Sequence, residues 1–175
     1  RWGVRVVAWA GGCVQGADRE GRECFMRQAL AVVREAAAGG GVPVGCVIVR
    51  GGEIVGRGRN RREEKRSAAS HAEMEAIAQA NEILGSWRLD GCELYVTLEP
   101  CPMCAGGIIN SRIETVRYGV RDEKAGACGS VLNLFEERFN HHPRLYRGPL
   151  EEECRNQLQE FFLDLREKES FPRNV

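Results

Sequence analysis

The chain has 175 residues, of which 43% are hydrophobic, and its 25 basic residues balance its 25 acidic ones. This length allows one sizeable core, and the zero net charge gives no overall attraction to nucleic acid. Eight cysteines occur, but they are scattered through apolar segments and no secretory signal accompanies them, so we expect reduced thiols in a cytoplasmic setting and not a disulfide framework.

The first twenty residues have no sustained hydrophobic period, and Arg5 interrupts their short apolar run. They fit neither a signal peptide nor a membrane span, and no later apolar run is long enough to cross a bilayer. We therefore predict that residues 1–20 form a disordered or non-native extension and that residues 21–170 form a single domain.

The remaining chain alternates helical and strand-like patterns. Apolar residues recur three and four apart over 23–38, which predicts an amphipathic helix ended by three glycines. Two strand-like runs, 44–50 and 53–58, flank Gly51-Gly52 and predict a hairpin. Further patterns predict helices over 71–84, 101–111 and about 149–168, a short helical piece within 132–139, and strands at 92–98, 114–120 and, weakly, 144–148.

This order predicts an α/β fold: a three-layer α-β-α sandwich around a mixed sheet of about five strands. Helices that start after strands place their N-termini at one sheet edge, where ligands tend to bind. His71 and Cys101 both lie at such helix starts. The sequence therefore directs attention to that edge.

The segment TLEPCPMCAGG, residues 97–107, places Cys101 and Cys104 on the first turn of a predicted helix, with Pro102 at its first position. The positive end of a helix favours thiolates. Three interpretations compete: a dithiol redox site, half of a structural zinc knuckle, and part of a catalytic metal centre. A knuckle needs a fourth ligand at short spacing, and none is present.

The segment SHAEMEAI, residues 70–77, contains a second candidate group. His71 can ligate a metal, and Glu73 can move protons. Each residue also has an ordinary role, because Ser70 and Glu73 match a capping box and a lone histidine near a helix start is commonly a plain polar residue. A redox site would leave both without a function.

Taken together, H-x-E followed by P-C-x-x-C is the zinc deaminase pattern, in which one His and two Cys bind the metal and the Glu is not a ligand. His71, Cys101 and Cys104 would hold zinc, with the fourth position left for water. Glu73 would take a proton from that water and deliver it to the substrate. The target is an amidine-type carbon that bears an exocyclic amine.

A basic run at 57–66, RGRNRREEKR, has six Arg or Lys among ten residues. A solvated loop with charges of both signs would look the same. The run is also the candidate local basic patch for a nucleic-acid partner. Both interpretations remain open from sequence.

From about residue 26 to 166 the chain resembles the bacterial tRNA-specific adenosine deaminases, of the cytidine deaminase-like zinc deaminase superfamily. The metal motif alone indicates only the superfamily. The resemblance to the tRNA enzymes is carried by LYVTLEPCPMCAGGIINSRI, by YGVRDEKAGACGSVLNL and by RFNHHP. The residues before Arg22 have no counterpart in it.

The resemblance implies hydrolytic deamination of adenosine to inosine at the wobble position of a tRNA anticodon stem-loop, by a homodimer with one zinc ion per subunit. It also implies RNA contacts: Asn60 on the flipped-out base, Asp122 and Lys124 on the backbone, and Asn140 with His141 on a neighbouring nucleotide. The pair Phe161-Phe162 resembles a segment that clasps the RNA loop, although core packing would explain it as well. The alternatives are a deaminase of the same fold acting on cytosine, guanine or a nucleoside, and a non-catalytic zinc-bearing subunit.

Overall fold

Five strands and five α-helices alternate along the part of the chain that the structure describes. This computed structural model describes residues 18–34 and 40–170, so residues 1–17 of the expected extension lie outside it. The elements are α1 (Arg19–Arg34), β1 (Gly45–Arg50), β2 (Glu53–Arg59), α2 (Arg62–Lys65), α3 (Ala72–Leu84), β3 (Cys92–Leu98), α4 (Pro102–Asn110), β4 (Thr115–Val120), the 3-10 turn η1 (Leu134–Glu136), β5 (Arg144–Arg147) and α5 (Glu151–Ser170).

The strands form one mixed sheet in the order β2-β1-β3-β4-β5. β1 is antiparallel to both β2 and β3, whereas β3, β4 and β5 are parallel. Parallel neighbours need a crossover, and α4 supplies it between β3 and β4. The predicted mixed five-stranded sheet is therefore confirmed.

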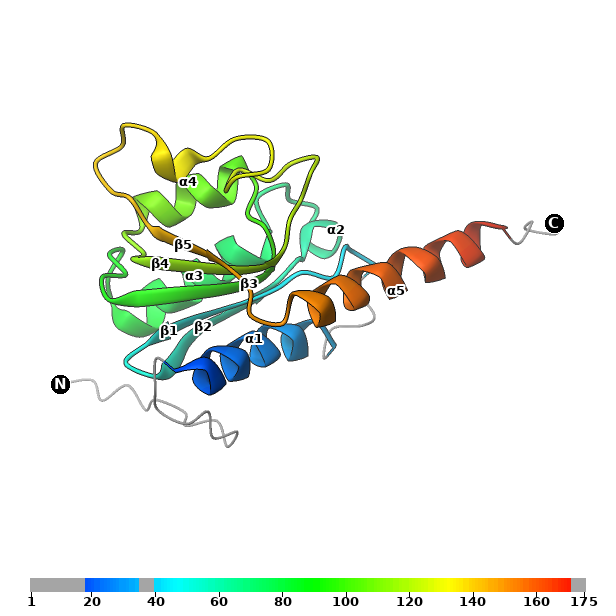
Figure 1. The fold of residues 1–175 in the computed structure, drawn as a ribbon, viewed down its shortest axis with the longest axis horizontal. Helices are drawn as coiled ribbons and strands as arrows, with labels where there is room; N and C mark the ends of the chain where they lie inside the picture. Colours follow the sequence, from blue (N-terminus) through cyan, green and yellow to red (C-terminus); the bar gives the residue numbers. More distant parts are fainter. Residues whose placement is uncertain (1–17, 35–39, 171–175) are drawn as a thin grey trace.

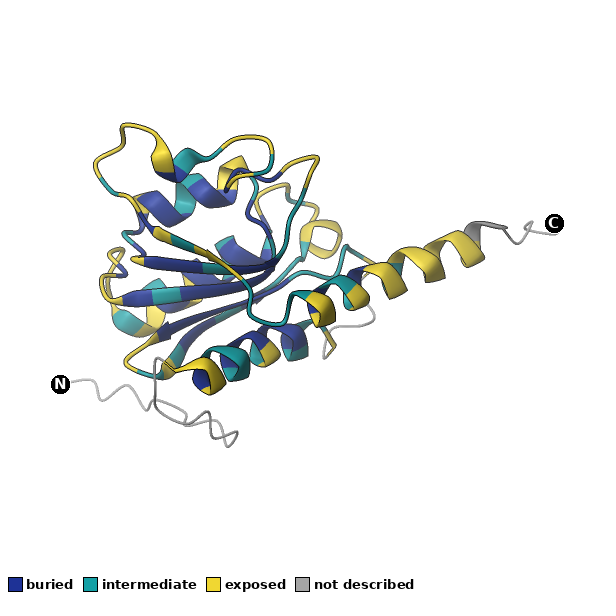
Figure 2. Ribbon diagram, in the orientation of Figure 1, coloured by how far each residue is buried: buried dark blue, intermediate teal, exposed yellow. Residues whose placement is uncertain are grey.

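Helices cover both faces of the sheet, with α1 and α5 below it and α4 above it in Figure 1. Side chains alternate along β1, so Cys46 and Ile48 join the core under α3 and α4, and Val47 and Val49 join the core against α1. The buried residues in Figure 2 follow this three-layer order, and the C-terminal part of α5 is largely exposed.

Glycine is required at the β1-β2 turn and at one point on β2 beside the site. Gly51 and Gly52 have φ of 59° and 81°, the left-handed values that a tight hairpin turn requires. Gly58 lies on β2 under the start of α3, where a Cβ would be 2.0 Å from the carbonyl oxygen of Ala72. The position of the first turn of α3 therefore depends on Gly58.

We expect Gly58→Ala to lower the free energy of unfolding by about 1–3 kcal/mol or more, because the added methyl group meets backbone and not a flexible side chain. Gly106→Ala is the matched control. A Cβ at Gly106, inside α4, meets nothing within 4 Å, and alanine is favoured over glycine in a helix by about 0.5–1 kcal/mol. Urea unfolding of the two variants checks the opposite signs, and equal effects would contradict the packing explanation.

No helix within residues 18–34 and 40–170 is long and apolar enough to cross a membrane. Cys24 on α1 is disulfide-bonded, so the expectation of a reduced thiol was wrong at this position. The other cysteines that the structure describes are free thiols: Cys46, Cys92, Cys101, Cys104, Cys128 and Cys154.

Candidate metal centre and adjoining cavity

Three potential metal ligands converge where two helices begin. His71 directly precedes α3 and Cys101 directly precedes α4, both with extended backbone, and Cys104 lies on the first turn of α4. Their ligand atoms all lie within 4.8 Å of one another. The structure thus brings together the three residues that the sequence assigns to zinc.

The distances within this cluster suit a tetrahedral zinc ion. The Nδ1 atom of His71 lies 3.6 Å from the Sγ atoms of both Cys101 and Cys104. Zinc bonds of about 2.0–2.1 Å to nitrogen and 2.3 Å to sulfur, at tetrahedral angles, place nitrogen and sulfur about 3.6 Å apart. One imidazole and two thiols, spaced in this way, fit a zinc ion with one position left over.

The two thiols differ in their acidity. The hydrogen bond from Cys104, with help from backbone N–H groups at the start of α4, lowers the pKa of Cys101 to about 5 despite its partial burial. The Cys101 thiolate and burial together raise the pKa of Cys104 well above its usual range. Without a metal the pair therefore shares one proton, which a cation would replace.

Glu73 lies on the first turn of α3 and is only 4% exposed. Burial raises the pKa of this carboxyl group to about 7. A group that titrates near neutral pH can both accept and donate a proton. The capping box that Ser70 and Glu73 could form as an alternative is not formed, because the helix begins one residue later, with His71 as its N-cap and no side-chain capping bond. The Glu73 carboxylate is therefore free of that structural role.

A cavity of about 570 Å³ opens beside the cluster. Its volume lies in the range of small-molecule sites and would admit a purine base. His71, Glu73 and Cys101 line it, together with residues of the loop after β4 and of α5. The residues that line it are Val42, Val44, Asn60, Arg62, His71, Ala72, Glu73, Leu98, Glu99, Cys101, Val120, Arg121, Asp122, Glu123, Lys124, Ala125, Leu158 and Phe162.

Three of the predicted substrate contacts line this cavity: Asn60, Asp122 and Lys124. Asn60 donates from Nδ2 to the carbonyl oxygen of Val42 at 3.1 Å and accepts the N–H of Arg62 at 3.1 Å, so its amide is held in one orientation. The Oδ1 atom of Asp122 accepts the N–H of Lys124 at 3.0 Å. Their predicted roles toward RNA stay predictions.

The structure does not bring Asn140 and His141 into the cavity of their own chain. The Nε2 atom of His141 lies 2.6 Å from the carbonyl oxygen of Ile113, just before β4 begins, whereas the cavity lies beyond the other end of β4. The six residues of this strand span about 20 Å. The long connection between β4 and β5 returns to the start of the sheet, which explains the separation.

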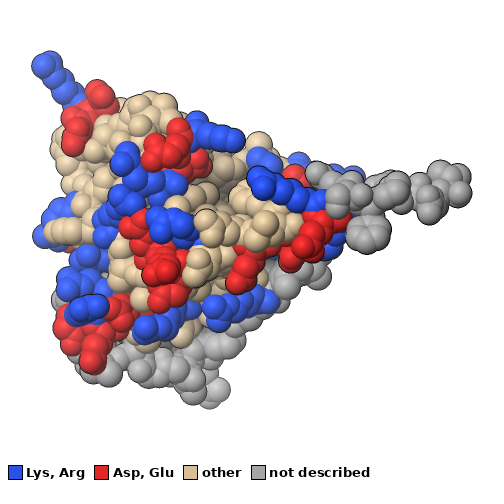
Figure 3. Space-filling view, turned by 45° about the vertical axis from the view of Figure 1, so that its right-hand side comes forward, with Lys and Arg blue, Asp and Glu red and all other residues tan. Residues whose placement is uncertain are grey.

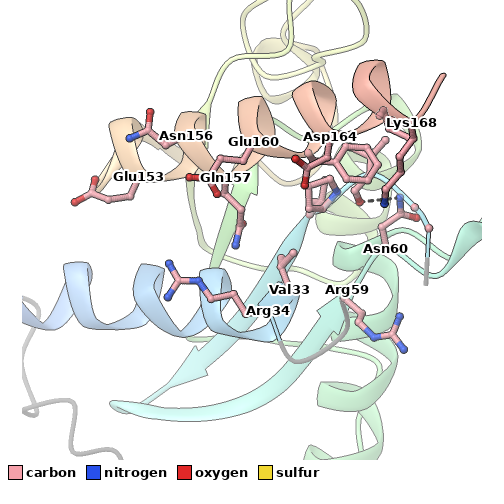
Figure 4. A pocket seen from close by; sticks show the side chains of 17 residues that line it. Val33, Arg34, Arg59, Asn60, Glu153, Asn156, Gln157, Glu160, Asp164 and Lys168 are labelled. Carbon is pink, nitrogen blue, oxygen red and sulfur yellow. Dashed lines mark hydrogen bonds between the residues drawn. The ribbon is translucent and has the colours of Figure 1, made fainter. Parts of the chain in front are cut away.

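A second groove, of about 560 Å³, lies between α5 and the segment that leads into β1. Figure 4 shows Glu160 and Asp164 of α5 on one side and Arg59 on the other. Asn60 lines both this groove and the cavity, and so marks the boundary between them. Phe161 lines the groove and Phe162, which is 46% exposed, lines the cavity. Core packing therefore does not explain the aromatic pair.

The basic run 57–66 is largely paired with its own acidic neighbours. Arg59 contacts Glu64 at 2.9 Å, and Lys65 contacts Glu75 at 2.8 Å. Positive and negative groups are also interspersed over the face shown in Figure 3. Within the run, Arg62 is the basic residue that lines the cavity. Residues 57–59 belong to β2 and residues 62–65 to α2, so the segment is not a loop, although most of its charges are paired within the protein.

Sequence analysis identified neither Glu99 nor Leu158, both of which line the cavity. Glu99 is 3% exposed and accepts backbone N–H groups from residues 23 to 31 positions later. The sequence signal that could have identified Glu99 was its position as an acidic residue between a buried strand and Pro100. Its partners are too distant in sequence for a local pattern to reveal them.

Known proteins are similar to this chain in sequence and fold. The family model of MafB19-like deaminases matches residues 20–166. The chain is 47% identical to the tRNA-specific adenosine deaminase of Bacillus subtilis (strain 168), over 86% of this chain and 94% of that protein. A structure from studies of A-to-I editing by tRNA:A34 deaminases at the wobble position superposes with a TM-score of 0.75 at 42% identity, covering 78% of this chain and 100% of the other. A guanine deaminase from Nitrosomonas europaea gives 0.69 at 25% identity, covering 79% and 83%.

Proposed function

This chain belongs to the family of tRNA-specific adenosine deaminases, and from that membership we propose that it deaminates adenosine to inosine at the wobble position of a tRNA anticodon. Water adds at C6 of the adenine ring and the exocyclic amine leaves as ammonia. The observation that supports this reaction is the juxtaposition of a His/Cys/Cys cluster with a buried glutamate in the lining of a purine-sized cavity. Relatives that act on tRNA match at higher identity than the guanine deaminase does.

We propose that His71, Cys101 and Cys104 hold one zinc ion per subunit. The 3.6 Å spacing of nitrogen and sulfur supports zinc, and the two thiols would bind it as thiolates. Bound zinc supplies a Lewis acid that activates water at neutral pH. The positive N-terminal ends of α3 and α4 would stabilise the two thiolates.

Glu73 moves the protons in this proposal. Its carboxylate takes a proton as water attacks, delivers it to the ring nitrogen, and transfers the second proton to the departing amine. Burial keeps its pKa near 7, so the group can serve as base and then as acid. Asn60, held by Val42 and Arg62, would orient the base by hydrogen bonding. A base reaches this depth only when it is flipped out of its stack.

The substrate is tested with purified protein and anticodon stem-loops that carry A at the wobble position, alongside free adenosine, cytidine and guanine. We expect inosine in the stem-loop and no ammonia from the free compounds. A stem-loop with G at the wobble position is the matched control. Ammonia released only from free guanine would overturn the proposed substrate and favour the guanine deaminase alternative.

We further propose a homodimer, supported by exposed apolar side chains on and near α4: Met103, Val131 and Leu132. Light scattering of the zinc-loaded protein tests this, with twice the 19.5 kDa chain mass expected.

We also propose that residues 21–170 form one domain that works in the cytoplasm, where tRNA is found. Asn140 and His141, distant from the cavity of their own chain, stay proposed RNA contacts.

A further inference from the structure

One buried carboxylate holds the cavity wall. Glu99 lies between β3 and α4, two residues before Cys101, and is 3% exposed. Its Oε1 atom accepts the N–H groups of Cys128 and Ser130, each at 3.0 Å. Its Oε2 atom accepts the N–H of Asp122 at 3.0 Å and the hydroxyl of Ser130. A single side chain thus ties together both ends of the segment 121–130.

The segment 121–130 has no helix or strand of its own beyond the isolated bridge at Cys128. Its first five residues, 121–125, line the cavity and include the predicted substrate contacts Asp122 and Lys124. Irregular segments keep their shape only where their backbone groups find fixed partners. Glu99 accepts hydrogen bonds from three backbone N–H groups of this segment. It therefore fixes the position of residues 121–125, which line the cavity.

The four hydrogen bonds that Glu99 accepts require a carboxylate at this position. Both of its oxygens only accept hydrogen bonds, whereas an amide would turn an N–H group toward one of the donors. A buried charge is costly unless it is fully hydrogen-bonded, which the four donors achieve here. The fit is also tight, because a Cβ on Gly126 would lie 2.4 Å from the Cδ atom of Glu99. Loop and carboxylate therefore fit only in one arrangement.

We propose that Glu99 is a positioning residue that fixes Asp122 and Lys124 relative to the metal ligands. Glu99 and Cys101 lie in the same turn between β3 and α4. This turn therefore positions both a metal ligand and, through Glu99, the cavity-lining residues 121–125. This inference rests on the proposed function, because it assigns Glu99 an effect on substrate binding. Glu99 does not contact the reacting atoms in this proposal.

Glu99→Gln tests the proposal, because glutamine keeps the shape but places an N–H group against a donor. We expect KM for the stem-loop to rise about tenfold, the size of one lost hydrogen bond to a charged group. We expect kcat within threefold of wild type and unchanged zinc content. Hydrogen exchange at the amide of Asp122 should become faster. A purely structural role would instead reduce the active fraction, and so kcat, at unchanged KM.

Glu93→Gln is the matched control, because Glu93 lies at the opposite end of β3 and contacts Tyr95 and Arg117. It should keep the wild-type KM. Gly126→Ala is a second variant in case Glu99→Gln fails to fold, and its methyl group should displace the carboxylate and raise KM similarly. A wild-type KM in both variants overturns the inference. If the wild-type protein leaves stem-loops unmodified, the proposed function fails, and unchanged exchange at Asp122 in the variants would then overturn the inference by itself.

Discussion

Replacing Glu73 with Gln is expected to abolish deamination while the metal stays bound. General acid–base catalysis by one side chain contributes about 10²–10⁴-fold, and Glu73 is assigned two proton transfers, so we expect the rate to fall toward the upper end of that range. Glu73 is not among the three clustered ligands, so zinc content should stay at one per subunit. The measurement is single-turnover inosine formation in the stem-loop, together with metal analysis of the same sample.

Glu75→Gln is the matched control for this variant. Glu75 lies one half-turn further along α3 and pairs with Lys65 at 2.8 Å, away from the lining of the cavity. A surface ion pair of this kind contributes about 0–1 kcal/mol, so activity should stay near the wild-type value. Persistent turnover in Glu73→Gln would contradict the assigned mechanism. Loss of zinc in that variant would contradict the view that Glu73 is not a ligand.

Sequence patterns were sufficient for the features that depend on neighbours in the chain. Pro102 and the glycine turn at Gly51-Gly52 indicate where elements begin and reverse, and the structure has α4 and the β1-β2 hairpin at those positions. The alternation of elements also predicted the mixed sheet. Because helix starts follow from local signals, the sequence could place His71, Cys101 and Cys104 at one sheet edge before their distances were known.

Features that depend on distant contacts were not predictable in the same way. The bonds from Asp122 and Ser130 to Glu99 require the strand order to bring the end of β4 beside the end of β3. The capping box of Ser70 and Glu73 is not formed either, since the helix begins after His71 and not after Ser70. Local patterns report which bonds a residue can make, and tertiary packing selects among them.

Removing a metal ligand is expected to eliminate both zinc and activity. Cys101 and Cys104 are two of the three ligands in the cluster, so the cluster as described holds no replacement for either. Even the partners that orient metal ligands change metal affinity by about 10–100-fold, so Cys104→Ala should exceed that loss. A strong chelator should inactivate the wild-type protein, and added zinc should restore it.

Thermal unfolding distinguishes this metal site from a dithiol redox pair. Zinc bound to the folded chain would raise Tm by mass action. A chelator should therefore lower the Tm of the wild-type protein and leave that of Cys104→Ala unchanged. Cys154→Ala is the matched control, because Cys154 is an equally buried free thiol on the opposite face of the sheet. It should keep its zinc, its chelator-sensitive Tm and its activity. A wild-type protein that contains no zinc, ignores chelators and cycles between dithiol and disulfide would show instead that the two cysteines form a redox pair.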